Sequence, residues 1–334
     1  FSVALPHENL EYNGSSLFGL FSQRKNLFNF RHLKMLWQID RFNKEALEVL
    51  EDKKLRDLSL EEYITHKKLG EDILKRFLIP MSSAVWSTPP EKIRKFPIRS
   101  LVRFFHNHGF MGLDTQHQWK TIPGGAKNYR DRLISQFKQK ISTDDPVCEI
   151  EDNESGVRLK TLSNVYDFDH VVMACHGDEA LKLLKNPTSK QRELLGCFEY
   201  QKNFATVHLD ASVMPKLKRN WCSWNFIYRK NSRGKEIPYT VYYMNSLQKV
   251  SKKNDYFVNV NGKEFIDPSL ILKEITYEHP VFNQAAVEAQ TNLSTLNKEG
   301  KVFFCGSYFR YGFHEDALQS SVNLCQEILG REVL

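Results

Sequence analysis

Several common signatures are absent from the 334-residue sequence. It contains no G-x-S-x-G, no H-E-x-x-H and no P-loop, which are the motifs of serine hydrolases, zinc peptidases and many nucleotide hydrolases. It also has no G-x-G-x-x-G, the phosphate-binding turn of dinucleotide-binding folds. No apolar run approaches the length of about 18 residues that a transmembrane helix needs. These absences favour a protein whose chemistry is supplied by a cofactor.

Cysteine is scarce and irregularly spaced. The six cysteines form no C-x-x-C pair, and most lie in apolar runs. We therefore expect reduced core residues of an intracellular, cytoplasmic protein. His106 and His108 would point apart in a strand, and two ligands alone do not build a metal site, so no metal centre is expected.

The net charge is modestly positive, because 47 Lys and Arg stand against 40 Asp and Glu, giving +7. The basic residues are scattered along the chain. Such an excess is typical of solvated surface and predicts no nucleic-acid interface. Peripheral contact with an anionic membrane surface stays open as an expectation.

The most informative stretch lies near the C-terminus. Residues 301–305 (KVFFC) form a short apolar run typical of a buried strand, and residues 306–315 form a turn with two glycines. From Asp316 onward, apolar residues recur at helical spacing. A strand, a glycine turn and a helix start direct backbone N–H groups and a positive dipole end toward a ligand. The same connection is common in α/β proteins that bind nothing there, but the aromatic residues of this turn favour a ligand role.

Helical patterns dominate residues 26–100. Ser59 and Glu62 have the spacing of a capping box that begins a helix. A second helical pattern runs from Glu71 to Leu78, and Pro80 is expected to end it.

Extended patterns dominate the later segments. Residues 168–174 are largely apolar, as in a buried parallel strand. Thr188 and Gln191 predict another capping box, and mostly strands follow it. Asn261-Gly262 suits a type I′ turn.

CGSYFRYGFHEDALQSS (305–321) resembles the C-terminal flavin-contacting segment of FAD-dependent oxidoreductases of the flavin amine oxidase superfamily, and more closely that of the bacterial-type predicted NAD/FAD-binding branch. The resemblance continues upstream in the same order and covers nearly the whole chain. Its segments are LEYNGSSLFGLFSQRKNL (10–27), FLIPMSSAVWSTPP (77–90), FPIRSLVRFFHNHG (96–109), QWKTIPGGAKNY (118–129), FDHVVMACHGDEAL (168–181) and WCSWNF (221–226).

The resemblance implies an α/β plus α+β fold. A Rossmann-like FAD/NAD(P)-binding domain is expected to be interleaved with an amine-oxidase-like substrate domain of antiparallel sheet and helices. We expect the substrate domain in residues 1–120 and 188–300, and the FAD-binding domain in residues 121–187 and 301–334. In the family, the FAD-binding domain opens with a βαβ unit carrying G-x-G-x-x-G. We therefore expect an incomplete Rossmann-like unit and a fragment of a longer protein, in which a targeting peptide cannot be judged.

The resemblance further implies a flavoprotein enzyme with FAD as its cofactor. The expected reaction transfers hydride from a C–H bond of an amine or a lipid-like small molecule to flavin N5. The alternative, motivated by the missing glycine turn, is a non-catalytic remnant or scaffold that has lost FAD binding. No residue is assigned as a catalytic base, and no oligomeric state is indicated.

The resemblance also assigns site residues, position by position. The expected cofactor-binding residues are Gly124, Gly125, Val147, Ala174, Gly306, Ser307, Gly312, Phe313, His314, Glu315, Asp316 and Ala317. The expected substrate-pocket residues are Trp86, Trp119, Trp224 and Tyr308. The carboxylates of Glu315 and Asp316 are expected to cap their own helix, while its backbone N–H groups favour a reduced flavin.

Overall fold

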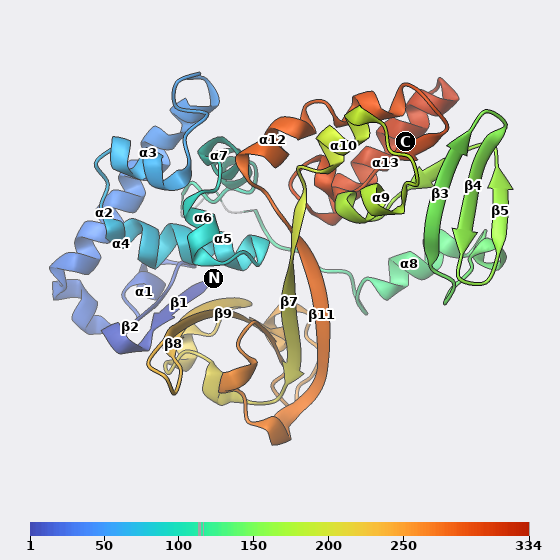
Figure 1. Cartoon of the computed structure of the whole chain (residues 1–334). Helices are drawn as coiled ribbons and strands as arrows, with labels where there is room; N and C mark the ends of the chain where they lie inside the picture. Colours follow the sequence, from blue (N-terminus) through green and yellow to red (C-terminus); the bar gives the residue numbers. More distant parts are fainter. Residues whose placement is uncertain (113–114, 116, 334) are drawn as a thin grey trace. The chain divides into compact units, whose positions relative to one another are not determined.

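The computed structural model describes residues 1–112, 115 and 117–333 (Figure 1). The chain divides into two compact units, residues 1–133 with 202–279, and residues 134–201 with 280–334. It passes between them within α8 (Lys127–Ile134), β7 (Glu199–His208) and β11 (Ile271–Val281). These crossings differ from the domain divisions expected after residues 120, 187 and 300, and the substrate and FAD roles of the two units stay predictions.

A seven-stranded mixed sheet supports the first unit, in the order β11-β7-β10-β9-β8-β1-β2. Its remaining strands are β1 (Ser2–Leu5), β2 (Leu10–Asn13), β8 (Trp224–Lys230), β9 (Glu236–Tyr243) and β10 (Phe257–Val260). β1 pairs antiparallel with β2 and parallel with β8. Because side chains alternate along a strand, Val3 and Leu5 pack in one core while Ala4 packs in another. Both faces of β1 are therefore covered.

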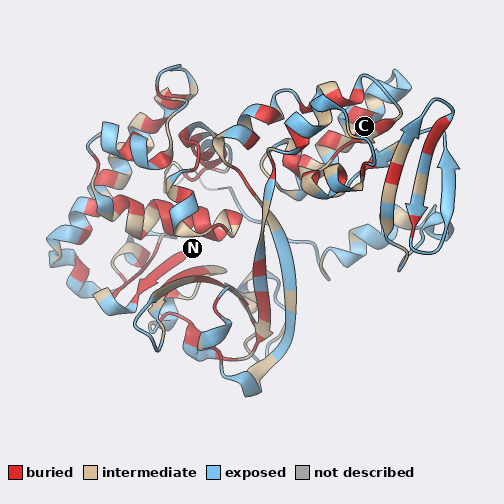
Figure 2. Ribbon diagram, in the orientation of Figure 1, coloured by how far each residue is buried: buried red, intermediate tan, exposed pale blue. Residues whose placement is uncertain are grey.

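Several helices belong to the same unit as this sheet. They are α1 (Leu17–Leu20), α2 (Phe30–Glu45), α3 (Leu60–His66), α4 (Glu71–Ile73), α5 (Ile79–Trp86), α6 (Pro90–Arg94), α7 (Ile98–Asn107) and α11 (Met244–Leu247). Met35 of α2 and Ala84 of α5 pack against Val3 of β1, and α5 is buried nearly throughout (Figure 2). The capping box of Ser59 and Glu62 is confirmed at the start of α3.

Pro80 does not end a helix, contrary to expectation. α4, the π-helical turn Leu74–Leu78 and α5 follow one another without a break, and Pro80 lies in the first turn of α5. Proline has no N–H to donate to the carbonyl four residues earlier, which belongs to Arg76. The Tyr12 hydroxyl donates to that carbonyl at 2.5 Å. The Tyr12 hydroxyl of β2 thus replaces the hydrogen bond that the missing N–H of Pro80 cannot donate to the Arg76 carbonyl.

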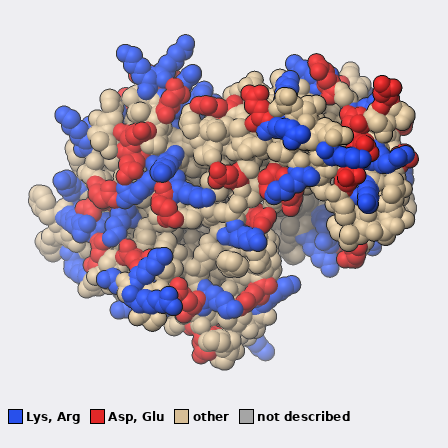
Figure 3. Space-filling view, in the orientation of Figure 1, with Lys and Arg blue, Asp and Glu red and all other residues tan. Residues whose placement is uncertain are grey.

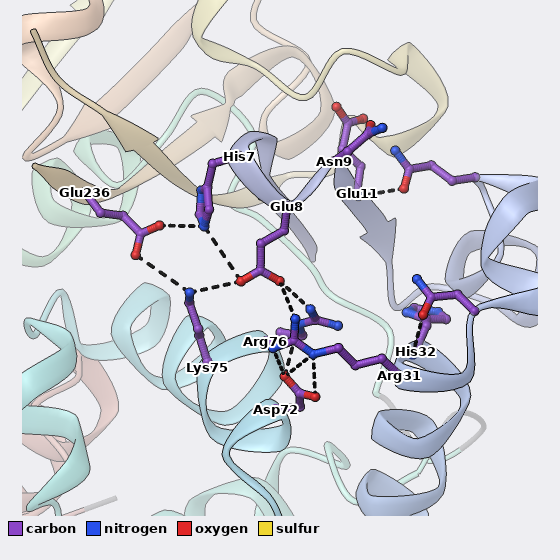
Figure 4. A network of polar contacts seen from close by, with 12 residues as sticks. His7, Glu8, Asn9, Glu11, Arg31, His32, Asp72, Lys75, Arg76 and Glu236 are labelled. Carbon is purple, nitrogen blue, oxygen red and sulfur yellow. Dashed lines mark hydrogen bonds and ion pairs between the residues drawn. The ribbon is translucent and has the colours of Figure 1, made fainter. Parts of the chain in front are cut away.

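The same helix carries a buried charge network (Figure 4). The side chain of Arg76 is only 4% exposed, and its guanidinium pairs with Glu8 and, at 3.4 Å, with Asp72. Lys75 lies 3.0 Å from the Glu8 carboxylate, and Arg31 binds Asp72 at 2.6 Å. Glu8 therefore links the start of the chain to this helix through two cations.

The second unit combines a parallel strand pair with a small antiparallel sheet. The parallel pair is β6 (Val171–Met173) and β12 (Val302–Phe304), and the three-stranded sheet is β3 (Val147–Asn153), β4 (Gly156–Thr161) and β5 (Val165–Phe168). Its further helices are α9 (Gly177–Leu183), α10 (Ser189–Leu195), α12 (Gln284–Gln290) and α13 (His314–Leu329). Met173, Leu195 and Phe304 belong to its core. The capping box of Thr188 and Gln191 is confirmed at α10.

Two local predictions are wrong. Residues 165–168 belong to antiparallel β5 and only residues 171–173 to a parallel pair, so no single strand covers 168–174. The strand considered for His106 and His108 is not formed, because His106 lies in the last turn of α7 and His108 directly follows this helix. Gly262 has φ −132°, whereas a type I′ turn needs positive φ at both central residues. The sheet order explains this last difference, because β7 separates β10 from β11 and the two strands form no hairpin.

Cysteine burial also differs from expectation. Only Cys305 is buried, while Cys148 and Cys325 are exposed. Cys148 occupies a strand position that points away from the core, although Val147 and Ile150 nearby are apolar.

The mixed fold class itself is confirmed, with α/β and α+β parts. Lys and Arg are interspersed with Asp and Glu over the surface shown in Figure 3, as the scattered charge pattern predicts. Within the described residues, no helix has both the length and the apolar character needed to cross a membrane.

Candidate active site

The first unit encloses an apolar cavity of about 520 Å³. Its walls come from β2, α1, α2, the α4–α5 helix, β8, residues 110–112 and Trp119. The apolar and aromatic lining residues are Phe1, Tyr12, Leu17, Leu20, Leu36, Ile39, Phe77, Met81, Phe110, Met111, Trp119 and Trp224. This volume lies in the range of about 300–1,000 Å³ that is usual for small-molecule sites.

The polar lining of the cavity comes largely from one helix. Asp40, Asn43 and Lys44 of α2 contribute to the wall. The Lys44 ammonium lies 2.7 Å from the Asp40 carboxylate, and both side chains are largely exposed, which places this ion pair at the rim. The amide oxygen of Asn43 is buried and has no donor among the described residues. The cavity therefore combines apolar walls with a polar rim.

Two of the four expected pocket residues line this cavity. The rings of Trp119 and Trp224 lie 4.9 Å apart at 71°. Trp86 is instead buried between Phe96 and Phe104, at 4.7 Å from each ring, and lies outside the lining. Tyr308, the fourth, belongs to the core of the second unit.

Most of the cavity wall was missed from the sequence. Leu36 and Ile39 of α2, and Phe77 and Met81 of the α4–α5 helix, look like ordinary core positions in their helical patterns. Tyr12 is fixed by its hydrogen bond to the Arg76 carbonyl. No local pattern separates a residue that lines a cavity from one that fills a core.

In the second unit, two expected cofactor segments meet at one sheet edge. β6 and β12 run parallel, with Phe304 beside Met173. The Cys305 N–H donates to the Met173 carbonyl at 3.1 Å, so Ala174 and Gly306 follow at the same carboxyl end. Ligands of open α/β sheets bind at such ends.

A groove of about 570 Å³ adjoins this sheet. Val147 and Ala174, which were expected from separate segments, both line it, together with Val172 and Cys175. Ala174 and Val172 are exposed there. The groove is mainly apolar, which suits a flat heteroaromatic ring.

The glycine turn after β12 has a constrained backbone. Gly306 has φ +155°, and a Cβ there would lie 2.7 Å from the Tyr308 ring. Tyr308 is 1% exposed and packs on Phe198, and burial raises the pKa of its phenol well above the usual value. The Gly306 N–H donates to the Ser320 hydroxyl at 2.9 Å, which ties the turn, including Ser307, to α13.

Helix α13 begins at His314, two residues before the expected start, directly after Gly312 and Phe313. The Asp316 carboxylate accepts the Phe313 N–H at 3.0 Å and thus caps its own helix, as expected. Burial raises the pKa of Asp316, and the Phe313 N–H and Arg310 offset part of this effect. Glu315 is exposed and Ala317 half-buried. The first-turn amides lack acceptors within the helix, which suits an anionic ligand.

Gly124 and Gly125 lie in the first unit and form the entry turn of α8. Their φ angles are +77° and +84°, and the Gly125 N–H donates to the Ile122 carbonyl at 2.9 Å. The glycine-led turn is thus confirmed. Its cofactor contact stays a prediction.

The remaining features of the second unit fit a dinucleotide-type cofactor. Paired strand ends, an apolar groove and a helix N-terminus are the elements that hold such groups. Val147, Ala174 and the turn 306–317 are the residues that would hold it.

The comparisons with known proteins agree with these features. The family model for flavin containing amine oxidoreductase matches residues 17–209. Wild-type putrescine oxidase bound to putrescine is similar in structure, with TM-score 0.61, 12% identity, and coverage of 96% of this chain and 79% of that one. The CLA-producing fatty acid isomerase from P. acnes has TM-score 0.61 and 11% identity, covering 89% and 75%. Cyclohexylamine oxidase from Brevibacterium oxydans IH-35A has TM-score 0.57 and 14% identity, also covering 89% and 75%. No curated protein matches the chain in sequence.

Proposed function

Since the chain belongs to the flavin-containing amine oxidoreductase family, we propose that it oxidises a C–H bond of an apolar amine or lipid-like molecule held in the cavity of its first unit. The protein is an FAD-dependent oxidoreductase. Bound FAD supplies a hydride acceptor at N5, while the protein supplies binding, orientation and exclusion of water.

The apolar cavity is the observation that carries this proposal. Tyr12, Phe77 and Trp224 offer aromatic surface to a hydrocarbon body, and few polar groups compete for it. An apolar wall also excludes water, which protects a hydride transfer from side reactions.

The polar lining limits the substrate to a small polar group on an apolar body. Asn43 and Ser15 are neutral polar residues of the lining that can form hydrogen bonds with such a group. Among the described residues, Asp40 is the only acidic one in the lining, and it is paired with Lys44 at the rim. Similar structures are named for an amine, putrescine, and for a fatty acid, so both chemistries support the range proposed.

A scaffold without FAD is the competing function. It rests on the missing G-x-G-x-x-G, and membership of an FAD-dependent family opposes it. FAD content of the purified protein separates the two.

Trp119→Ala tests the role of the cavity. We expect about tenfold lower kcat/KM for apolar substrates, mainly through KM, because one aromatic wall is lost. Trp119 is 57% exposed, so the fold should survive the change. The measurement is anaerobic flavin reduction at varied substrate concentration. Tyr277→Ala, which changes an aromatic residue of similar exposure (48%) outside the lining, is the control. Unchanged kinetics in Trp119→Ala would place the substrate elsewhere.

A further inference from the structure

The first helices of the chain carry an unusual amount of exposed apolar surface. Phe18 of α1, Phe28 before α2, and Phe30 at its start are 91%, 91% and 85% exposed. The set of exposed residues, named the 18–37 face below, is Phe18, Leu27, Phe28, Phe30, Leu33 and Trp37. Large apolar side chains gathered in one exposed segment mark an interaction surface.

The face is held on a rigid support. Phe30, Leu33 and Trp37 recur at i, i+3 and i+7 of α2, so they form one stripe on its solvent side, opposite its buried side. One ring nitrogen of His32 lies 3.0 Å from the Leu20 carbonyl and fixes α1 to α2. The exposed aromatics are therefore displayed by ordered helices.

Within the segment that carries the face, every charged residue is a cation, and one of them, Arg31, is paired with Asp72 of another helix. Residues 12–39 contain no Asp or Glu, but include Arg24, Lys25, Arg31 and Lys34. Arg24 and Lys34 are exposed and have no acidic partner within the described part of the chain. The Arg41 guanidinium lies 5.9 Å from the centre of the Trp37 ring. Aromatic side chains with neighbouring cations complement a surface that has an apolar interior and negatively charged groups at its boundary with water.

We infer that the 18–37 face docks on an anionic lipid bilayer. Its aromatic side chains enter the boundary between headgroups and acyl chains, and Arg24 and Lys34 face the anionic headgroups. An anionic bilayer offers an apolar interior for the aromatic side chains and negatively charged headgroups for the cations. It does so without a complementary protein surface.

The docking face adjoins the cavity. Leu17 precedes Phe18, is 64% exposed, and also lines the cavity. A docked molecule would thus hold one edge of the cavity at the bilayer, from which a lipid-like substrate could enter. This link to substrate supply rests on the proposed function, whereas the docking does not.

Vesicle flotation of the purified full chain tests the docking. We expect the protein to float with vesicles of phosphatidylcholine and phosphatidylglycerol in equal parts. Phosphatidylcholine alone should bind about tenfold less, and salt should weaken the anionic binding, because surface charges are screened. Tryptophan emission should shift to the blue with anionic vesicles, and Trp37→Phe should lose much of that shift.

Matched variants distinguish vesicle binding through the 18–37 face from nonspecific binding through other exposed apolar residues. Phe18→Ser/Phe28→Ser/Phe30→Ser should bind anionic vesicles at least about tenfold more weakly, because three aromatic side chains no longer leave water. Its melting temperature and FAD content should not change, since these side chains are exposed and outside the cavity. Leu162→Ser/Val165→Ser/Phe168→Ser removes a comparable exposed set in the second unit and should float like the wild type. Arg24→Glu/Lys34→Glu should abolish the preference for anionic vesicles.

Three outcomes would overturn the inference. The protein could stay unbound with both vesicles, or the triple phenylalanine variant could float like the wild type. A dimer in light scattering that the same variant converts to a monomer, without vesicle binding, would assign the face to a second copy. Loss of FAD with intact flotation would contradict only the proposed function.

Discussion

Replacing Glu8 with alanine lowers the free energy of unfolding by about 3 kcal/mol at neutral pH, because it leaves a buried cation without its main partner. The Arg76 side chain is 4% exposed and would keep only Asp72, at 3.4 Å (Figure 4). Because Arg76 keeps its contact with Asp72, the expected loss of unfolding free energy lies at the lower end of the usual range for breaking a buried ion pair. Urea unfolding followed by far-ultraviolet circular dichroism measures it.

The effect of Glu8 depends on pH in a defined direction. Burial raises the pKa of Glu8, but the hydrogen bond from Lys75 and the charges of Arg76 and Lys75 together hold it below its usual value of 4.5. A carboxylate with a lowered pKa stabilises the fold above its unfolded pKa and loses this contribution as pH falls through its folded pKa. The difference between wild type and Glu8→Gln should therefore shrink as pH drops below about 4.5.

A surface pair supplies the control. Glu61 lies 2.8 Å from Arg94 and is half-exposed, so Glu61→Ala should cost less than about 1 kcal/mol. Equal losses in Glu8→Ala and Glu61→Ala would contradict the role given to the buried network.

Gly306→Val should remove most FAD binding and destabilise the second unit by about 2–4 kcal/mol. Gly306 has φ +155°, which side-chain-bearing residues rarely adopt, and a Cβ would lie 2.7 and 2.9 Å from atoms of the Tyr308 ring. Tyr308 cannot yield easily, because it is buried against Phe198. The turn and the start of α13 would shift together. Flavin absorbance per protein measures the loss of FAD.

Gly330→Ala is the matched control for Gly306. Gly330 also has positive φ, at +63°, but a Cβ there meets nothing within 4 Å. It ends α13, so alanine should cost only about 1 kcal/mol and leave FAD content intact. Normal FAD content in Gly306→Val would show that the glycine turn does not contact the cofactor.

Some predictions that depend only on residues close together in the sequence were confirmed. The capping box of Ser59 and Glu62 needs only residues within one helical turn, and it begins α3 as predicted. The strand, glycine turn and helix of residues 301–329 also formed, with the helix start displaced by two residues. The displacement arises because Asp316 caps the helix from inside its first turn.

Predictions failed where a distant segment decided the outcome. Pro80 continues a helix because Tyr12, far away in sequence, donates to the carbonyl that proline leaves open. The Asn261-Gly262 turn differs because β11 pairs beside β7 and not beside β10. Neither the hydrogen bond nor the strand order can be inferred from the residues that neighbour Pro80 or Gly262 in the sequence.

The cavity was predicted only in part, for a similar reason. Trp119 and Trp224 were expected from the resemblance, and both line it. Leu36 and Ile39 share the spacing of core residues, and whether such residues meet a neighbour or an empty volume depends on packing between elements. Trp86 shows the reverse, since it fills the core between Phe96 and Phe104.

An absorption spectrum tests the central claim, FAD-dependent oxidation of a substrate in the cavity, most directly. Absorption spectra of the purified protein are recorded before and after anaerobic addition of apolar amines and fatty acids. We predict the two absorption bands of oxidised flavin, bleached by at least one of these substrates and restored when an electron acceptor is admitted. Flavin bands that stay absent, even after reconstitution with FAD, would contradict the account and leave a scaffold in its place.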